Sequence, residues 1–107
     1  MSKINDMVKR LREENAKIDS NSPVEKEGMR DAFSEVILLS KKFENDDELP
    51  FLSMMFTKMS NDPYFMYGEE SPNFDSDTYH NGRNKAFEKI LAIANDAVEE
   101  TETEREY

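Results

Sequence analysis

The sequence predicts an all-α protein, a compact bundle of about four helices with an irregular acidic and aromatic loop and a frayed acidic tail. Apolar residues recur every three or four positions along most of the 107 residues, which is the period of an amphipathic helix. No stretch shows the period of two that is typical of strands. The residues that break helices gather between the periodic segments. We expect a single domain over residues 1–98 and an acidic tail over residues 99–107.

The first half of the chain predicts two helices. The first covers about residues 4–18, and its apolar face consists of Ile4, Met7, Val8, Leu11 and Ile18. The second begins at Ser22, a capping residue, with Pro23 at the first helical position and Glu25 completing a capping box. Its apolar face extends to Phe43. Because residues 36–39 are all apolar, we expect this helix to lie centrally in the bundle.

The second half predicts two further helices and an irregular segment between them. Pro50 begins a helix that continues to Met59, and residues 60–78 are irregular because proline and glycine interrupt a stretch rich in Asn, Asp and Ser. The last helix extends from about Asp77 to Val98. Residues 99–107 carry five glutamates and no apolar stripe, so we expect this tail to fray.

A short sequence pattern occurs twice, at an offset of 54 residues. Residues 28–33 and 82–87 both begin with Gly and end with Ala-Phe, and two apolar residues follow at matching positions. Glycine inside a helix costs about 1 kcal/mol relative to alanine, so it needs a local reason. Close approach of the two helices, with room for Phe33 and Phe87, is the reason we favour. Duplication of a helical hairpin is the alternative.

The charge of the chain is strongly uneven. The formal net charge is -10, and residues 44–78 hold nine acidic residues against a single basic one, Lys58. We expect no direct contact with nucleic acid, because phosphate binding needs clustered Lys and Arg, and an acidic membrane surface would repel the chain. A basic protein surface is the complementary partner. The alternative is that the acidic residues only keep the protein soluble.

No motif in the sequence predicts catalysis, a metal or a cofactor. Cysteine is absent, His80 is the single histidine, and the three glycines form no phosphate-binding motif. Asp75, Asp77 and His80 either bind a cation weakly or form an exposed helix start, and we favour the second interpretation. We therefore expect a protein that is not an enzyme, with no metal and no cofactor.

The start of the last helix is a candidate site for a small anion. Helix N-termini attract anions, and an arginine adds a bidentate donor, so a nucleotide is the expected ligand. The residues concerned are Tyr79, Asn81, Arg83 and Asn84. The alternative is that Arg83 pairs with acidic residues of the preceding loop.

The acidic segment is the main candidate for a partner-binding surface. Aromatic residues are common anchors of protein interfaces, and acidic residues around them would select a basic partner. The predicted contact residues are Asp46, Asp47, Glu48, Tyr64, Phe65, Tyr67, Glu69, Glu70, Phe74, Asp75 and Asp77. Alternatively, Tyr64, Phe65 and Phe74 fold back over the helices as a lid.

In composition and layout the whole chain resembles small acidic phage-encoded early proteins, including anti-restriction DNA mimics and anti-CRISPR proteins. This resemblance implies an inhibitor that blocks the basic nucleic-acid-binding groove of a host defence or DNA-processing protein. The alternatives are a nucleotide-binding sponge that uses residues 79–84, and a virion or assembly component. Because no apolar run has the length of a membrane span or a signal peptide, we expect the host bacterial cytoplasm. A homodimer is a further expectation.

Overall fold

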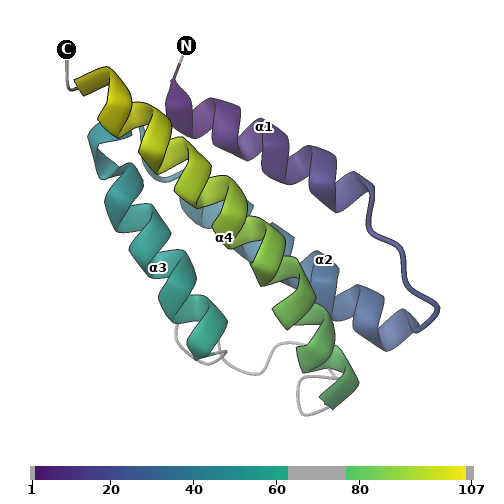
Figure 1. Ribbon diagram of the computed structural model, residues 1–107. Coiled ribbons are helices and arrows are strands. Elements are labelled where there is room, and N and C mark those ends of the chain that lie inside the picture. The colour runs from purple at the N-terminus through teal and green to yellow at the C-terminus, as the bar shows by residue number, and fades with distance from the viewer. Residues whose placement is uncertain (1, 63–76, 106–107) are drawn as a thin grey trace.

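The computed structural model describes residues 2–62 and 77–105, with side chains up to Thr101 (Figure 1). The helices are α1 (Lys3–Ala16), α2 (Pro23–Ser40), the short 3-10 helix η1 (Asp46–Glu48), α3 (Leu49–Asn61) and α4 (Asp77–Arg105). No strand occurs in these ranges, so the predicted all-α class is confirmed. None of the helices within them is long and apolar enough to cross a membrane.

The helices alternate in direction along the chain. Figure 1 shows α1 and α3 running one way and α2 and α4 running the other, with α1 and α3 on opposite sides of the α2–α4 pair. Helix α4 packs against each of the other three α-helices. The molecule is elongated, with extents of 47 × 26 × 18 Å along its principal axes. Helices α2 and α4 form its central pair.

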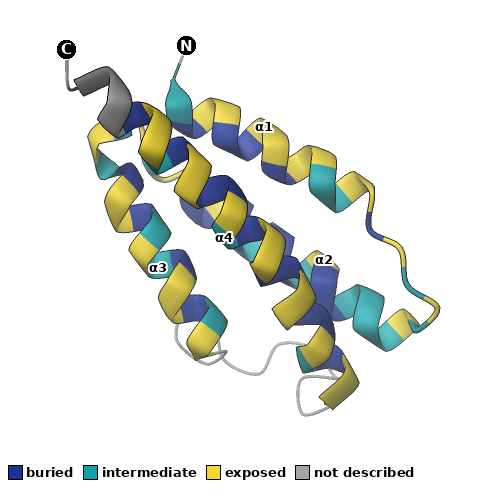
Figure 2. Ribbon diagram, viewed as in Figure 1, coloured by how far each residue is buried: buried dark blue, intermediate teal, exposed yellow. Residues whose placement is uncertain are grey.

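The core lies along the inner faces of all four α-helices (Figure 2). Its largest fully buried side chains are Tyr79, Phe33, Phe56, Phe87, Ile4, Met7, Leu11, Leu49, Leu52, Ile90 and Val36. Phe33 and Phe87, predicted to be buried in the α2–α4 pair, are 0% and 1% exposed. This part of the prediction is confirmed.

Two glycines bring α2 and α4 into backbone contact. A Cβ atom at Gly28 would collide with the carbonyl oxygen of Tyr79, and one at Gly82 would collide with that of Glu25. Each glycine therefore faces the beginning of the opposite helix. The repeated Gly and Ala-Phe pattern thus belongs to the two helices of one close contact. This is the interpretation that we favoured for both glycines from the sequence.

The start of α2 agrees with its prediction except at Glu25. The hydroxyl oxygen of Ser22 accepts a hydrogen bond from the amide of Glu25 at 3.3 Å, and Pro23 occupies the first turn. The Glu25 carboxylate does not complete a capping box. It accepts a hydrogen bond from the Ser20 hydroxyl at 3.1 Å and pairs with Lys85 at 2.8 Å. The contact with Lys85 holds the pKa of the Glu25 carboxyl below its ordinary value. The carboxylate thus joins α2 to α4.

Helix α2 is shorter than predicted. It ends at Ser40 rather than Phe43, and Leu38, in the apolar run at residues 36–39, is 57% exposed. Helix α2 shares the centre of the bundle with α4, because α1 and α3 lie on opposite sides of the α2–α4 pair.

The last helix extends further than predicted. Helix α4 continues without a break through residues 99–105. Ile90, Ala94, Ala97 and Thr101 are all buried and share one face, and the Thr101 hydroxyl donates a hydrogen bond to the Ala97 carbonyl at 3.0 Å. The buried stripe thus extends past residue 98 to Thr101, and the division into a domain over residues 1–98 and a tail over residues 99–107 stays a prediction.

Candidate functional site

Two residues of the predicted anion site point into the α2–α4 interface. The Nη2 atom of Arg83 lies 2.7 Å from Oε2 of Glu35, and its side chain is only 4% exposed. The Tyr79 hydroxyl, one turn earlier, donates a hydrogen bond to Oδ2 of Asp31 at 2.6 Å. These contacts lie one turn apart on both helices. They join α2 and α4 beside the glycine contact.

The surroundings of this pair favour one charge state. Burial, together with the hydrogen bond to Asp31, raises the pKa of Tyr79 well above its ordinary value, so the phenol stays protonated. Burial opposes the charge of Arg83, but the carboxylate of Glu35 outweighs it and raises the pKa of the guanidinium. The guanidinium also lies 5.7 Å from the ring centroid of Phe87. Arg83 is thus a fixed cation with its partner already in place.

This arrangement does not bring the four predicted anion-binding residues together. Asn81 and Asn84 are exposed, whereas Tyr79 and Arg83 are buried against acidic residues of α2. An anion would have to displace Glu35 from Arg83. Pairing of Arg83 with an acidic residue was the predicted alternative, but its partner comes from α2 rather than from the preceding loop.

Asp46 has a structural role that the sequence prediction missed. Its carboxylate accepts hydrogen bonds from the backbone amides of Lys3 at 3.0 Å and Ile4 at 3.2 Å, which are two of the free donors at the start of α1. These amides, Lys3 first, hold the pKa of Asp46 below its ordinary value. Asp46 therefore joins η1 to α1, and its carboxylate is engaged within the protein.

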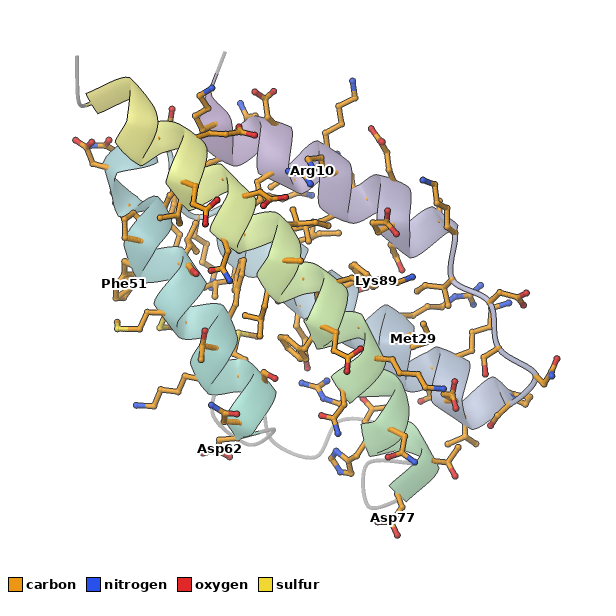
Figure 3. All side chains as sticks on the ribbon, viewed as in Figure 1. Arg10, Met29, Phe51, Asp62, Asp77 and Lys89 are labelled. Carbon is orange, nitrogen blue, oxygen red and sulfur yellow. The ribbon has the colours of Figure 1, made fainter. Side chains whose placement is uncertain are left out.

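The other predicted partner-binding residues fall into separate groups. Asp47 is exposed and Glu48 is half-buried, both in η1. Asp77 is exposed at the start of α4, which lies at the same end of the bundle as the end of α3 and at the opposite end from the start of α3 (Figures 1 and 3). The predicted lid and the remaining predicted contact residues lie outside the described residues; these are Tyr64, Phe65, Tyr67, Glu69, Glu70, Phe74 and Asp75. Those that the structure describes thus occupy both ends of the bundle.

The start of α3 carries apolar side chains that are not buried. Phe51 is 44% exposed and Met54 is 60% exposed. Figure 3 shows Phe51 on the side of α3 that faces away from α4. The ring of Phe43 packs against Phe51 with centroids 5.9 Å apart. We call Phe43, Phe51 and Met54, together with the acidic residues Glu44, Asp47 and Glu48, the α3 patch.

A partial signal for the α3 patch is present in the sequence. Residues 51–59 of the predicted helix are apolar at six positions, which is more than one face of a short helix can bury. Phe51 and Met54 are the surplus, while Leu52, Phe56 and Met59 form the buried face. Which apolar residues stay outside depends on how α3 is rotated against α4.

No group of three or more metal-binding side chains occurs in the part of the chain that the structure describes. His80 is half-buried, and its ring is nearly perpendicular to the Tyr79 ring, with the two centroids 5.6 Å apart. Comparison with protein-family models, with curated proteins and with solved structures finds no match to this chain.

Proposed function

We propose that the protein is a non-enzymatic binding protein of the phage inhibitor type. It covers the basic nucleic-acid-binding groove of a host defence or DNA-processing protein and blocks that groove sterically. The observation that carries this proposal is the α3 patch, where exposed apolar side chains lie beside acidic residues in a protein with a net charge of -10.

The apolar part of the α3 patch supplies the anchors. Phe51 and Met54 are three residues apart in one helix, so both project from the same face. Aromatic and Met side chains are enriched in interfaces, and burying one such side chain contributes about 1.5–3 kcal/mol. The ring of Phe43 packs against that of Phe51, and this contact limits the conformational freedom that Phe51 loses on binding.

The acidic part of the α3 patch selects the partner. Glu48 precedes Phe51 by one helical turn, and Asp47 adjoins it in η1. A groove that normally holds DNA or RNA is lined by Lys and Arg, which these carboxylates complement. Acidic residues at the rim accelerate association, whereas buried anchors slow dissociation. The partner is therefore a basic nucleic-acid-binding protein.

Capture from a bacterial lysate, followed by competition with DNA, tests the proposal. We expect the wild-type protein to retain nucleic-acid-binding proteins and added duplex DNA to release them. Phe51→Ser removes an anchor, and Glu48→Lys reverses a rim charge, so both should reduce capture about tenfold or more. Glu88→Lys makes the same change of charge at an exposed position of α4 and should capture normally.

Three results would contradict the proposal. Release that is insensitive to DNA would exclude a nucleic-acid groove as the target. Equal losses with Glu48→Lys and Glu88→Lys would leave net charge, rather than the α3 patch, as the cause of binding. Self-association at about micromolar concentration that Phe51→Ser abolishes would assign the α3 patch to a homodimer or an assembly contact instead.

A further inference from the structure

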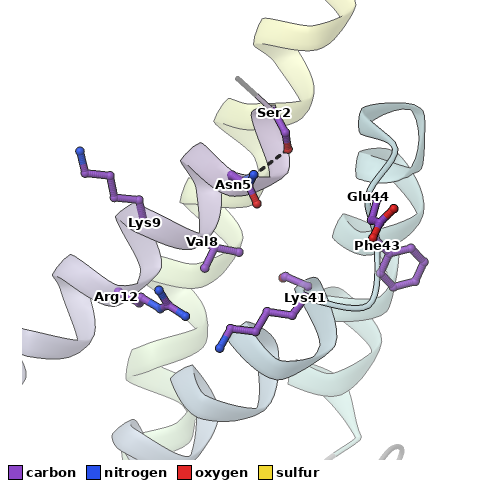
Figure 4. Close-up of a pocket in the computed structure, with 9 residues that line it drawn as sticks. Ser2, Asn5, Val8, Lys9, Arg12, Lys41, Phe43 and Glu44 are labelled. Atoms are coloured by element: carbon purple, nitrogen blue, oxygen red, sulfur yellow. Dashed lines mark hydrogen bonds between the residues drawn. The ribbon is translucent and has the colours of Figure 1, made fainter.

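A cavity of about 580 Å³ opens where the start of α1 meets the end of α2 (Figure 4). Three of its lining side chains are basic, namely Lys9, Arg12 and Lys41, and one is acidic, Glu44. It lies at the opposite end of α2 from the Gly28 contact. It is therefore separate from the buried Arg83 pair and from the anion site predicted at residues 79–84.

The three basic side chains of the cavity have no partners among the described residues. Neither an ion pair nor a side-chain hydrogen bond joins Lys9, Arg12 or Lys41 to any residue in residues 2–62 and 77–101. Figure 4 shows the charged ends of Arg12 and Lys41 directed toward each other across the cavity. Like charges that share a space repel, and an anion placed between them removes that repulsion.

These three basic side chains stand out because they line one cavity. Five other basic residues each lie within ion-pair distance of a carboxylate: Arg10, Lys17, Arg83, Lys85 and Lys89. Lys26, Arg30 and Lys42 also lack an ion pair among the described residues, but none of them lines the cavity. The chain has 24 acidic residues and could have supplied such partners for the cavity as well. Instead, a local positive site remains in a strongly acidic protein. At physiological salt the distant negative charges are screened beyond about 8 Å, whereas the cavity's own charges act at contact.

The size and the remaining lining define the ligand further. Pockets of about 300–1,000 Å³ hold small organic ligands, so 580 Å³ exceeds what a single phosphate needs. The Asn5 amide and the Glu44 carboxylate supply a donor and acceptors that match a sugar or a base. Val8 adds an apolar surface. Phosphate groups suit the basic side, because Arg binds them in a bidentate manner and Lys acts as a point charge.

We propose that this cavity binds a small phosphorylated ligand of nucleotide size, with Arg12, Lys41 and Lys9 holding its phosphates. The proposal does not depend on the inhibitor function. The α3 patch and the cavity share the side chains of Phe43 and Glu44, so an occupied cavity would adjoin the patch without covering its anchors.

Calorimetric titration of the full chain with ADP, pyrophosphate and adenosine tests this site at physiological salt. We expect ADP to bind more tightly than either fragment, because each fragment satisfies only one side of the cavity. Arg12→Glu should weaken ADP binding about tenfold or more. Arg30→Glu makes the same charge change at an exposed position of α2 outside the cavity, and we expect less than about a twofold effect.

Backbone amide shifts in an NMR titration locate the site, with the largest changes expected at residues 2–12 and 40–44. Lys41→Gln, at an exposed position, provides a second variant if Arg12→Glu does not fold, and thermal midpoints measured without ligand check both. Equal weakening by Arg12→Glu and Arg30→Glu would overturn the proposal, as would adenosine binding as tightly as ADP. The proposal would also be overturned if ADP shifted only the amide signals of residues 79–84, or if ADP did not bind at about 1 mM. Binding of an acidic peptide in place of ADP would overturn it as well.

Discussion

The two ends of the bundle differ in how closely their helices pack and in whether their charged side chains are paired. At the end where α2 and α4 begin, glycines bring two backbones into contact, and a charged pair is buried beside them. At the other end, the Asp46 carboxylate joins η1 to the start of α1, and a cavity and exposed apolar side chains remain there.

Because of this difference, we expect one end of the bundle to determine stability and the other to determine binding. A contact between backbones leaves no room for a ligand, and the charges that accompany it are already paired. The open end keeps unpaired basic side chains and exposed anchors, which contribute little to folding and are free to meet a ligand or a partner. Substitutions at the first end should therefore change stability, whereas substitutions at the second should change binding.

The largest expected contrast is between two phenylalanines. Phe33 is 0% exposed and Phe51 is 44% exposed. Phe33→Ala should lower the free energy of unfolding by about 3–5 kcal/mol, enough to unfold a small domain at room temperature. Phe51→Ala should change it by less than about 1 kcal/mol. Urea denaturation followed by circular dichroism measures both, and equal losses would show that the α3 patch is part of the core.

Breaking the buried ion pair should have the next largest effect. Glu35→Gln leaves the Arg83 guanidinium buried without its counter-charge, which costs about 3 kcal/mol. Asp96→Asn breaks the pair of Arg10 and Asp96, whose side chains are 44% and 57% exposed, and should cost less than about 1 kcal/mol. A similar loss in both variants would mean that Arg83 is hydrated rather than buried.

The helices and the core could be predicted from the sequence because they follow local rules. Helix starts depend on capping residues such as Ser22, and buried faces depend on spacing within one segment. The contact at Gly28 and Gly82 was also within reach, because an internal glycine in a helix is costly and the same pattern occurs twice. These features require no knowledge of how the segments meet.

The rest depended on how the helices are placed against one another. Glu35 was not foreseen as the partner of Arg83, because the pairing requires the register of α2 against α4. Asp46 was assigned to a surface because its place in an acidic run hides that it meets α1, more than 40 residues away in the chain. The predicted end of α4 was too early, because Thr101, which extends the buried face of the helix past Val98, lies in a polar stretch of sequence.

The glycine contact itself provides a smaller effect. Gly82→Ala places a Cβ atom against the carbonyl of Glu25, so the helices must move apart, and overpacking of this kind costs about 1–3 kcal/mol. Asn84→Ala, at an exposed position of α4, makes the helix intrinsically more favourable and should not destabilise. Thermal midpoints compare the two. An unchanged or raised midpoint in Gly82→Ala would show that the close contact of α2 and α4 does not exist.

The smallest effect is expected at the open end, from Asp46→Ala. This substitution removes the acceptor of the Lys3 and Ile4 amides, and loss of a helix-capping interaction costs about 1 kcal/mol. Because its pKa is lowered in the folded protein, the Asp46 carboxylate stabilises the fold above about pH 3.9, the ordinary aspartate value, and this contribution is lost as the pH falls through the lowered pKa.

The wild type and Asp46→Ala should therefore differ at pH 7 and become equal in strong acid, as measured by urea unfolding over a pH series. Glu13→Ala removes the same charge from an exposed position of α1 and controls for the net charge. A difference that persists below the lowered pKa would mean that Asp46 acts through packing. If Glu13→Ala gave the same pH dependence, the effect would come from relief of the overall negative charge, and the carboxylate would not be what holds η1 to α1.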